Sequence, residues 1–442
     1  MNLADSELLM LENLTCINKD TMALVKGLKP VSSYRTVGDY LSFFDETVLR
    51  VLEAKGNTTV AGGECSGSEL AAMIRYMKEN KVFQRLNIVG SPVNKNNHTM
   101  ALCMEDPLQP QSAIVAFYGT LDSEEWKDNA EGLYQADTDA QREALLYIDS
   151  LPYKDLTVIG HSKGGNKAQY VTILSNKVRR GLSFDGQGFS REFIDKYSSA
   201  IAKNAGKIKN YSLSTDFIHP LLSPIPGATQ LYVDGGSDVK SIGEHHSPNA
   251  FFVFYVDSNN HTQIVCTKEG IPYLPMTEED PSVRVIHNFT NFIQHTANEL
   301  DKKVIGDYVG DLLAIQFDSS LSYERRLNTL LKRLLRIPKE SATLFAYLLK
   351  YIEAYHLKNK DVTPLLQALG LSELKQLLDF DSYDLKNILK ALRQELSYWE
   401  KNMLLYHIVL LLLSVTELTF NVYAFWQELE DKFLSLKGNT LP

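Results

Sequence analysis

Short apolar runs alternate with amphipathic stretches along roughly the first 300 residues of the chain. Turn residues bound these runs, and β-branched and aromatic side chains fill them, which is typical of strands. They predict strands at residues 86–89, 100–104, 113–117, 156–159, 181–184, 207–213 and 230–233, and a hairpin of 251–256 with 263–267. Helical periodicity covers residues 137–151, 166–176, 190–203 and 283–300. This alternation predicts an α/β fold in which helices cover a mostly parallel sheet.

The strand pattern disappears after about residue 300. Leucines recur there at helical spacing, at Leu327, Leu330, Leu331, Leu334 and Leu335. We therefore predict a domain over 1–300, which includes an N-terminal helical cap segment, and an all-helical domain over 301–442. The apolar stretch 404–415 contains His407, which favours a buried helix over a membrane span. Peripheral docking of the C-terminal helices on a lipid surface is the alternative.

Composition narrows the range of partners and locations. The formal net charge of -9 argues against a nucleic-acid partner. The acidic start of the chain lacks the basic region of a signal peptide, which favours the cytoplasm. The 4 cysteines are scattered, with no C-x-x-C pair for zinc or redox chemistry, and we expect no metal or cofactor.

The strand pattern at 156–159 ends in Gly160-His161-Ser162-Lys163-Gly164, and helical periodicity begins at once. This strand–turn–helix context is the one that a nucleophile elbow of the α/β-hydrolase fold requires. Glycines at both ends leave room for a strained turn that exposes a serine hydroxyl. The pattern predicts Ser162 as a nucleophile, and His161 as a packing residue or one on the oxyanion side.

A serine nucleophile needs a base, and in this fold the chain order is serine, acid, histidine. His245 and His246 lie in a loop after the last main strand, and either fits the chemistry. Asp216 follows the strand pattern at 207–213, where it could orient an imidazole. Asp185, at the end of the preceding strand, is the rival acid. Asp234 and Asp238 are weaker candidates, and His219 is expected to be a loop residue.

The backbone N–H of Lys163, which follows the nucleophile, is the first predicted oxyanion donor. The buried strand at 113–117 runs into Tyr118-Gly119-Thr120, and that turn is placed to offer the Thr120 backbone with its hydroxyl assisting. The side chain of Lys163 is expected to face solvent.

These segments resemble a known group of enzymes. Phe117-Tyr118-Gly119-Thr120, followed by Trp126, Asp128 and Asn129, is similar to the oxyanion segment of class 3 (fungal-type) lipases. Together with Gly-His-Ser-Lys-Gly-Gly-Asn at 160–166 and Phe-Asp-Gly-Gln-Gly-Phe at 184–189, it resembles more closely a bacterial family of lipase-like α/β-hydrolases of unassigned function.

The resemblance covers roughly residues 10–300. It implies a triad of Ser162, Asp216 and His246, with Thr120 as an oxyanion residue, because a His-Ser pair follows the last main strand in that family. Tyr118 replaces the arginine usual in class 3 lipases, so the local salt bridge of those enzymes is not carried over.

The expected function is a serine hydrolase of the esterase or lipase type, acting on a small-molecule ester or lipid through an acyl-enzyme. A segment that includes residues 40–44 is expected to cover the site as a lid or cap. The alternative is a non-catalytic binding or scaffold protein that kept the elbow and whose helical region engages a membrane or partner. Pocket shape decides the acyl-chain length, and one sequence does not define it.

Overall fold

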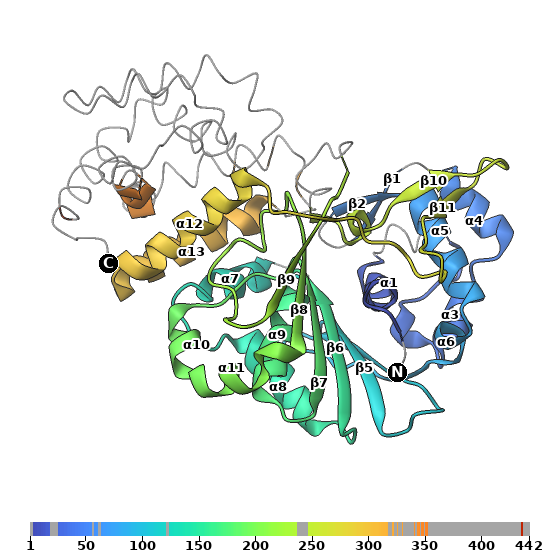
Figure 1. Ribbon diagram of the computed structural model, residues 1–442, viewed down its shortest axis with the longest axis horizontal. Helices are drawn as coiled ribbons and strands as arrows, with labels where there is room; N and C mark the ends of the chain where they lie inside the picture. The colour runs from blue at the N-terminus through green and yellow to red at the C-terminus, as the bar shows by residue number, and fades with distance from the viewer. Residues whose placement is uncertain are drawn as a thin grey trace, which may run out of the picture.

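The computed structural model describes residues 3–17, 25–54, 57–60, 63–120, 123–236 and 246–316, with scattered positions beyond 316. An 8-stranded sheet runs through the described part, in the order β12-β9-β8-β7-β6-β5-β4-β3 (Figure 1). Its strands are β3 (Asn87–Gly90), β4 (Ala101–Glu105), β5 (Ser112–Phe117), β6 (Asp155–His161), β7 (Val178–Phe184), β8 (Ile208–Leu213), β9 (Thr229–Val233) and β12 (Met276–Thr277).

The five central strands β5 to β9 are parallel, whereas β3, β4 and β12 pair antiparallel at the two edges. The chain therefore has a mixed, mostly parallel sheet with covering helices, as the sequence predicts. Parallel strands bring their carboxyl ends to one edge of a sheet, where open α/β sheets bind their ligands.

Each sheet face packs on its own layer because successive side chains of a strand point to opposite faces. In β5, Ala113, Val115 and Phe117 join one core, and Ile114 and Ala116 join the other. The first core holds α8 (Asp139–Ser150), α9 (Lys163–Leu174), α10 (Arg191–Lys196) and α11 (Ser198–Asn204). The second holds α1 (Asp5–Cys16), α3 (Val37–Leu41), α4 (Glu46–Glu53), α5 (Gly67–Glu79) and α6 (Lys81–Arg85).

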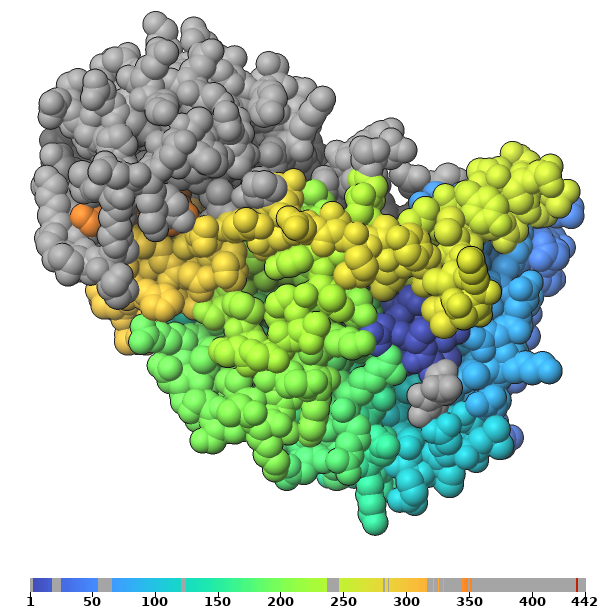
Figure 2. Space-filling model, viewed as in Figure 1, coloured from blue at the N-terminus to red at the C-terminus, as the bar shows by residue number. Residues whose placement is uncertain are grey.

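Two small hairpins and three further α-helices also belong to the described part. The hairpins are β1 (Asn57–Val60) with β2 (Gly63–Ser66), and β10 (Phe254–Val256) with β11 (Thr262–Ile264). The helices are α7 (Ser123–Glu131), α12 (Pro281–Thr296) and α13 (Glu299–Gln316). On the face drawn in Figure 2, only a small dark-blue part of the N-terminal segment reaches the surface, between the green sheet region and the layer of α5 and β11.

The predicted strands and the hairpin are confirmed, with ends shifted by a few residues. The helix predicted at 190–203 divides into α10 and α11 at Tyr197. Strand β12 was not predicted, because two residues are too short to show an alternation. Strands β1 and β2 were also missed.

The C-terminal predictions fall mostly outside the described residues. That holds for the leucine stripe at 327–335 and the apolar stretch 404–415. Helix α13 crosses the expected domain boundary at 300 and packs on α7. Among the helices that are described, none combines the length and the apolar character needed to cross a membrane.

Candidate active site

Ser162 lies between the end of β6 and the first turn of α9, with φ 56° and ψ −124°. A positive φ is uncommon outside glycine and is maintained only where the surrounding backbone enforces it. Here the Ser162 N–H donates to the Phe184 carbonyl at 2.8 Å, and the Asn166 N–H donates to the Ser162 carbonyl at 3.2 Å. The backbone at Ser162 therefore has the strand–turn–helix geometry that the sequence predicts. Ser162 is 5% exposed.

The glycines that flank the serine are required by close backbone contacts. A Cβ at Gly160 would lie 2.2 Å from the carbonyl carbon of Gly164. One at Gly164 would lie 2.2 Å from the Phe117 carbonyl oxygen at the end of β5. These contacts bring the serine turn directly against the strand that leads into the predicted oxyanion segment.

His246 and Asp216 form a buried pair beside this turn. Their Nδ1 and Oδ1 atoms lie 2.7 Å apart. Since a carboxylate only accepts, we assign the proton to Nδ1, which leaves the lone pair of the neutral ring on Nε2. That Nε2 is buried and has no hydrogen-bond partner among the residues that the structure describes. The His246 ring also contacts His161, the residue before Ser162, with ring centroids 4.6 Å apart.

The charge of Asp216 is strongly stabilised. Burial raises the pKa of Asp216, but the charge of His246 and hydrogen bonds from His219 and His246 outweigh burial and hold that pKa below its usual value. Oδ2 also accepts the backbone N–H groups of Ile218 at 3.0 Å and His219 at 2.7 Å. His219, expected to be an ordinary loop residue, is thus part of the site.

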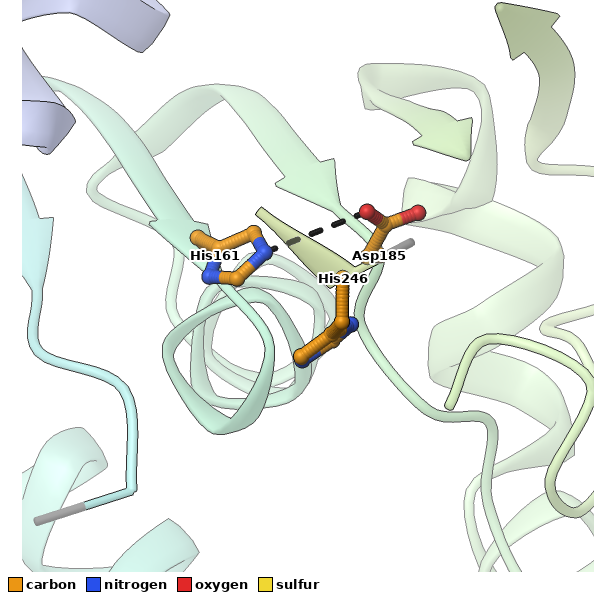
Figure 3. A group of neighbouring side chains, drawn as sticks. All are labelled: His161, Asp185 and His246. Atoms are coloured by element: carbon orange, nitrogen blue, oxygen red, sulfur yellow. Dashed lines mark ion pairs between the residues drawn. The ribbon is translucent and has the colours of Figure 1, made fainter. Parts of the chain in front are cut away.

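Asp185 occupies a different position from the one a triad acid would need. Its Oδ1 accepts the Leu213 N–H at 2.8 Å, and its Oδ2 lies 3.9 Å from His161 Nε2 (Figure 3). Burial, followed by the nearby charge of Asp216, raises the pKa of Asp185 well above its usual value. A neutral carboxyl group does not stabilise an imidazolium as a carboxylate does, so Asp216 is the better supported acid.

The other candidates differ in what the structure says of them. His245 and Asp238 lie outside the described residues. Asp234 is exposed and accepts the Gly236 N–H at 2.9 Å. His161 is buried against His246, as a packing residue would be; burial and the neighbouring charge of His246 lower the pKa of His161 well below its usual value.

Thr120 lies close to the elbow. A Cβ at Gly119 would lie 3.9 Å from Ser162 Cβ, which places the Tyr118-Gly119-Thr120 turn beside Ser162. Thr120 Oγ1 accepts a hydrogen bond from Asn129 Nδ2 of α7 at 3.1 Å. Lys163 is the first residue of α9, where backbone N–H groups have no intrahelical partner.

The expectation that the Lys163 side chain faces solvent is wrong. The residue is 1% exposed, and its Nζ forms an ion pair with Asp128 of α7. Asp128 also accepts from Thr138 Oγ1 at 2.8 Å and the Ala140 N–H at 3.1 Å. One turn along α9, Lys167 pairs with Glu125 at 3.3 Å. Sequence proximity to the elbow could not reveal partners more than thirty residues away.

The predicted cap segment packs in the second core. Tyr40, Leu41 and Phe44 are buried there, together with α1. Phe43 is exposed. A covering role over Ser162 stays a prediction.

Two side-chain groups of the described part contain residue types that bind metals: His161 with Asp185 and His246, and Asp185 with Asp216 and His219. Within each group, one ligand atom per residue lies within 4.8 Å of the others. However, Asp216 already hydrogen-bonds to both His246 and His219. We therefore interpret Asp216, His219 and His246 as one hydrogen-bonded network. The first group is not joined in this way: His161 Nε2, Asp185 Oδ2 and His246 Nε2 are buried and have no hydrogen-bond partner among the described residues.

Comparison with known proteins gives a family match over part of the chain. No curated protein and no solved structure matches the chain. Residues 77–245 match the model of the Mbeg1-like family, which is related to lipase-like proteins. The matched region begins in α5 and runs through β9, and it contains Thr120, Ser162, Lys163 and Asp216. By this region, the chain is similar to the Mbeg1-like family.

Proposed function

We propose that this protein is a serine hydrolase of the α/β-hydrolase fold that cleaves carboxylic esters. One observation carries the proposal: the buried His246–Asp216 pair, at 2.7 Å, lies against the elbow that holds Ser162 at a positive φ of 56°. A nucleophile, a base and an acid that orients the base are the parts of a triad.

In the proposed reaction, Ser162 Oγ attacks the ester carbonyl carbon and His246 Nε2 takes the hydroxyl proton. Asp216 keeps the proton of the ring on Nδ1 and stabilises the imidazolium. The carbonyl electrons move to the oxygen, which the backbone N–H groups of Lys163 and Thr120 stabilise. The tetrahedral intermediate expels the alcohol, which takes the proton from His246. Water then hydrolyses the acyl-enzyme by the same steps.

The decisive experiment is labelling of the folded protein with a fluorophosphonate probe. The probe should react at Ser162, and Ser162→Ala should abolish the label. Ser175→Ala provides the control, because this buried serine lies at the opposite end of α9, and the change should leave labelling intact. Absence of any label on folded protein would contradict the proposal and favour a non-catalytic binding or scaffold protein.

Asp216→Asn tests the role of the His246–Asp216 pair. Loss of the acid in a triad lowers turnover about 10⁴-fold because the tautomer of the base changes. A panel of esters of graded acyl length would then define the substrate, proposed to be a small-molecule ester or lipid. A cytoplasmic location and a lipid contact by the C-terminal helices stay predictions.

A further inference from the structure

A second imidazole lies on the acid of the proposed triad. His219 follows Asp216 by three residues, and its Nδ1 lies 3.1 Å from Asp216 Oδ2. Its Nε2 lies 3.5 Å from Glu279 Oε1. Only 8% of the His219 side chain is exposed, so this ring is held between two carboxyl groups with little access to water.

The two histidines use different oxygens of one carboxylate. His246 contacts Oδ1 and His219 contacts Oδ2, so neither ring displaces the other. Backbone N–H groups of Ile218 and His219 add two further bonds to Oδ2. The carboxylate of Asp216 therefore contacts two imidazole rings. One is His246, the proposed base, and the other is His219, which takes no part in the proposed reaction.

The surroundings of His219 favour its charged form. Burial lowers the pKa of His219, but the hydrogen bond to Asp216 and the nearby Glu279 carboxylate outweigh burial and raise that pKa above its usual value. The groups that face this ring come from several elements: Tyr232 of β9, whose ring is tilted and lies 5.7 Å away, Asp185 after β7, Glu279 before α12, and Arg284 and His287 of α12 acting on Glu279. His246 is faced by Asp216 and His161.

We propose that His219 is a positioning residue that tunes the base: its positive charge offsets part of the charge of Asp216 and so lowers the affinity of His246 for a proton. The inference rests on the proposed function. A carboxylate favours an imidazolium beside it, and a cation on the same carboxylate opposes that effect. His246 is then unprotonated, and competent as a base, at lower pH than a simple His–Asp pair would allow.

His219→Gln separates charge from hydrogen bonding, because an amide can still donate to Asp216 Oδ2 without a positive charge. In the variant, the acid limb of the kcat/KM profile for ester hydrolysis should move upward by about one pH unit. The plateau at high pH should stay within about fivefold, because the base there is unprotonated in both proteins. A purely structural role would lower the plateau and leave the limb in place.

His287→Gln is the matched control. His287 lies on α12, where its charge reaches Glu279, and its Nε2 contacts Asn291 at 2.8 Å rather than the triad. The acid limb of this variant should coincide with that of the unchanged protein. An unshifted limb in folded His219→Gln, or an equal shift in His287→Gln, overturns the proposal.

A titration that needs no turnover keeps this test separate from the proposed function. In Ser162→Ala protein, imidazole resonances in ¹⁵N NMR should show His219 losing its proton at higher pH than His246. Adding His219→Gln should move the His246 titration upward. If His219 titrates below His246, the inference fails whatever the labelling shows. If the titrations behave as expected but the probe does not label Ser162, only the proposed hydrolase activity fails.

Discussion

Three fully buried carboxyl groups near the serine turn differ in their partners. Asp216 faces two imidazoles and two backbone N–H groups, which stabilise its charge. Asp185 has one backbone donor and the negative Asp216 nearby. Glu12, on α1, accepts from Thr15 Oγ1 at 3.3 Å and Cys16 Sγ at 3.4 Å. The partners rather than the residue type decide which carboxyl is charged.

Glu12 gives a prediction about pH and stability. Burial raises the pKa of Glu12 to about 8, although hydrogen bonds from Cys16, Thr15 and the His161 backbone oppose the effect. The folded state therefore binds more protons than the unfolded chain above about pH 4.5, and stability falls as the pH rises toward 8. Glu12→Gln removes this titration and should raise the free energy of unfolding at pH 8 by about 2 to 4 kcal/mol.

Urea denaturation at pH 5 and pH 8 would measure the difference. The gain should be small at pH 5 and large at pH 8, because the carboxyl of the unchanged protein is still protonated at the lower pH. The exposed Glu79→Gln should change neither value by more than about 0.5 kcal/mol. An equal effect of Glu12→Gln at both pH values would show that Glu12 does not titrate in this range.

At the scale of elements, α7 connects the two halves of the proposed oxyanion site. Asn129 contacts Thr120 on one side, and Asp128 and Glu125 pair with two lysines of α9 on the other. Helix α9 begins at the residue that follows Ser162. The distance between the two proposed oxyanion donors thus depends on how α7 sits against α9.

Asp128→Asn tests this connection. Burial raises the pKa of Asp128, but the charge of Lys163 outweighs burial and lowers that pKa below its usual value. The ion pair therefore contributes its full stabilisation of the fold above the ordinary aspartate pKa. This stabilisation is lost as the pH falls through the lowered pKa. Without the carboxylate, the buried Lys163 ammonium loses its ion-pair partner. The free energy of unfolding at pH 7 should fall by about 3 to 5 kcal/mol.

The control for this loss is a similar charge change in an exposed pair. Asp195 pairs with Arg191 at 3.5 Å on the surface of α10, with both side chains more than half exposed. Asp195→Asn should cost less than about 1 kcal/mol by chemical denaturation. Comparable losses in the two variants would contradict a special role of the buried pair.

At the scale of the whole molecule, the segment that follows α12 packs against α7, the helix that contacts the proposed site. Helix α13 packs on α7 through two glycines. A Cβ at Gly306 would lie 2.9 Å from the Ala130 carbonyl oxygen, and one at Gly310 would lie 2.8 Å from Ala130 Cβ. Small residues at these positions allow the two helix backbones to approach closely.

Gly306→Ala should separate the helices. Alanine is favoured over glycine within a helix by about 1 kcal/mol, but overpacking against the α7 backbone costs about 1 to 3 kcal/mol. We expect a net loss of stability in denaturation and slower fluorophosphonate labelling of Ser162, because α7 also holds Thr120. Gly206→Ala, where a new Cβ meets nothing within 4 Å, should change neither. Unchanged labelling in Gly306→Ala would show that α13 does not influence the site.

The features that could be predicted from the sequence are those that local patterns of residues determine. The alternation in β5 and β6 and the glycines around Ser162 are local, so the strands and the elbow could be read directly. Asp216 was identifiable because parallel strands end at a common edge. The burial of Lys163 and the contact of His219 with Glu279 depend on residues 35 and 60 positions away, which no local pattern encodes.

The short antiparallel strands at the two sheet edges affect how copies of the protein meet. Strand β12 pairs through only two residues, and β3 is interrupted by a register shift between Ile88 and Gly90. A long, flat edge invites pairing with another chain, whereas short or bulged edges discourage it. The described sheet therefore offers a second copy a poor template for strand addition. Exposed side chains, rather than backbone edges, should govern any self-association at high concentration.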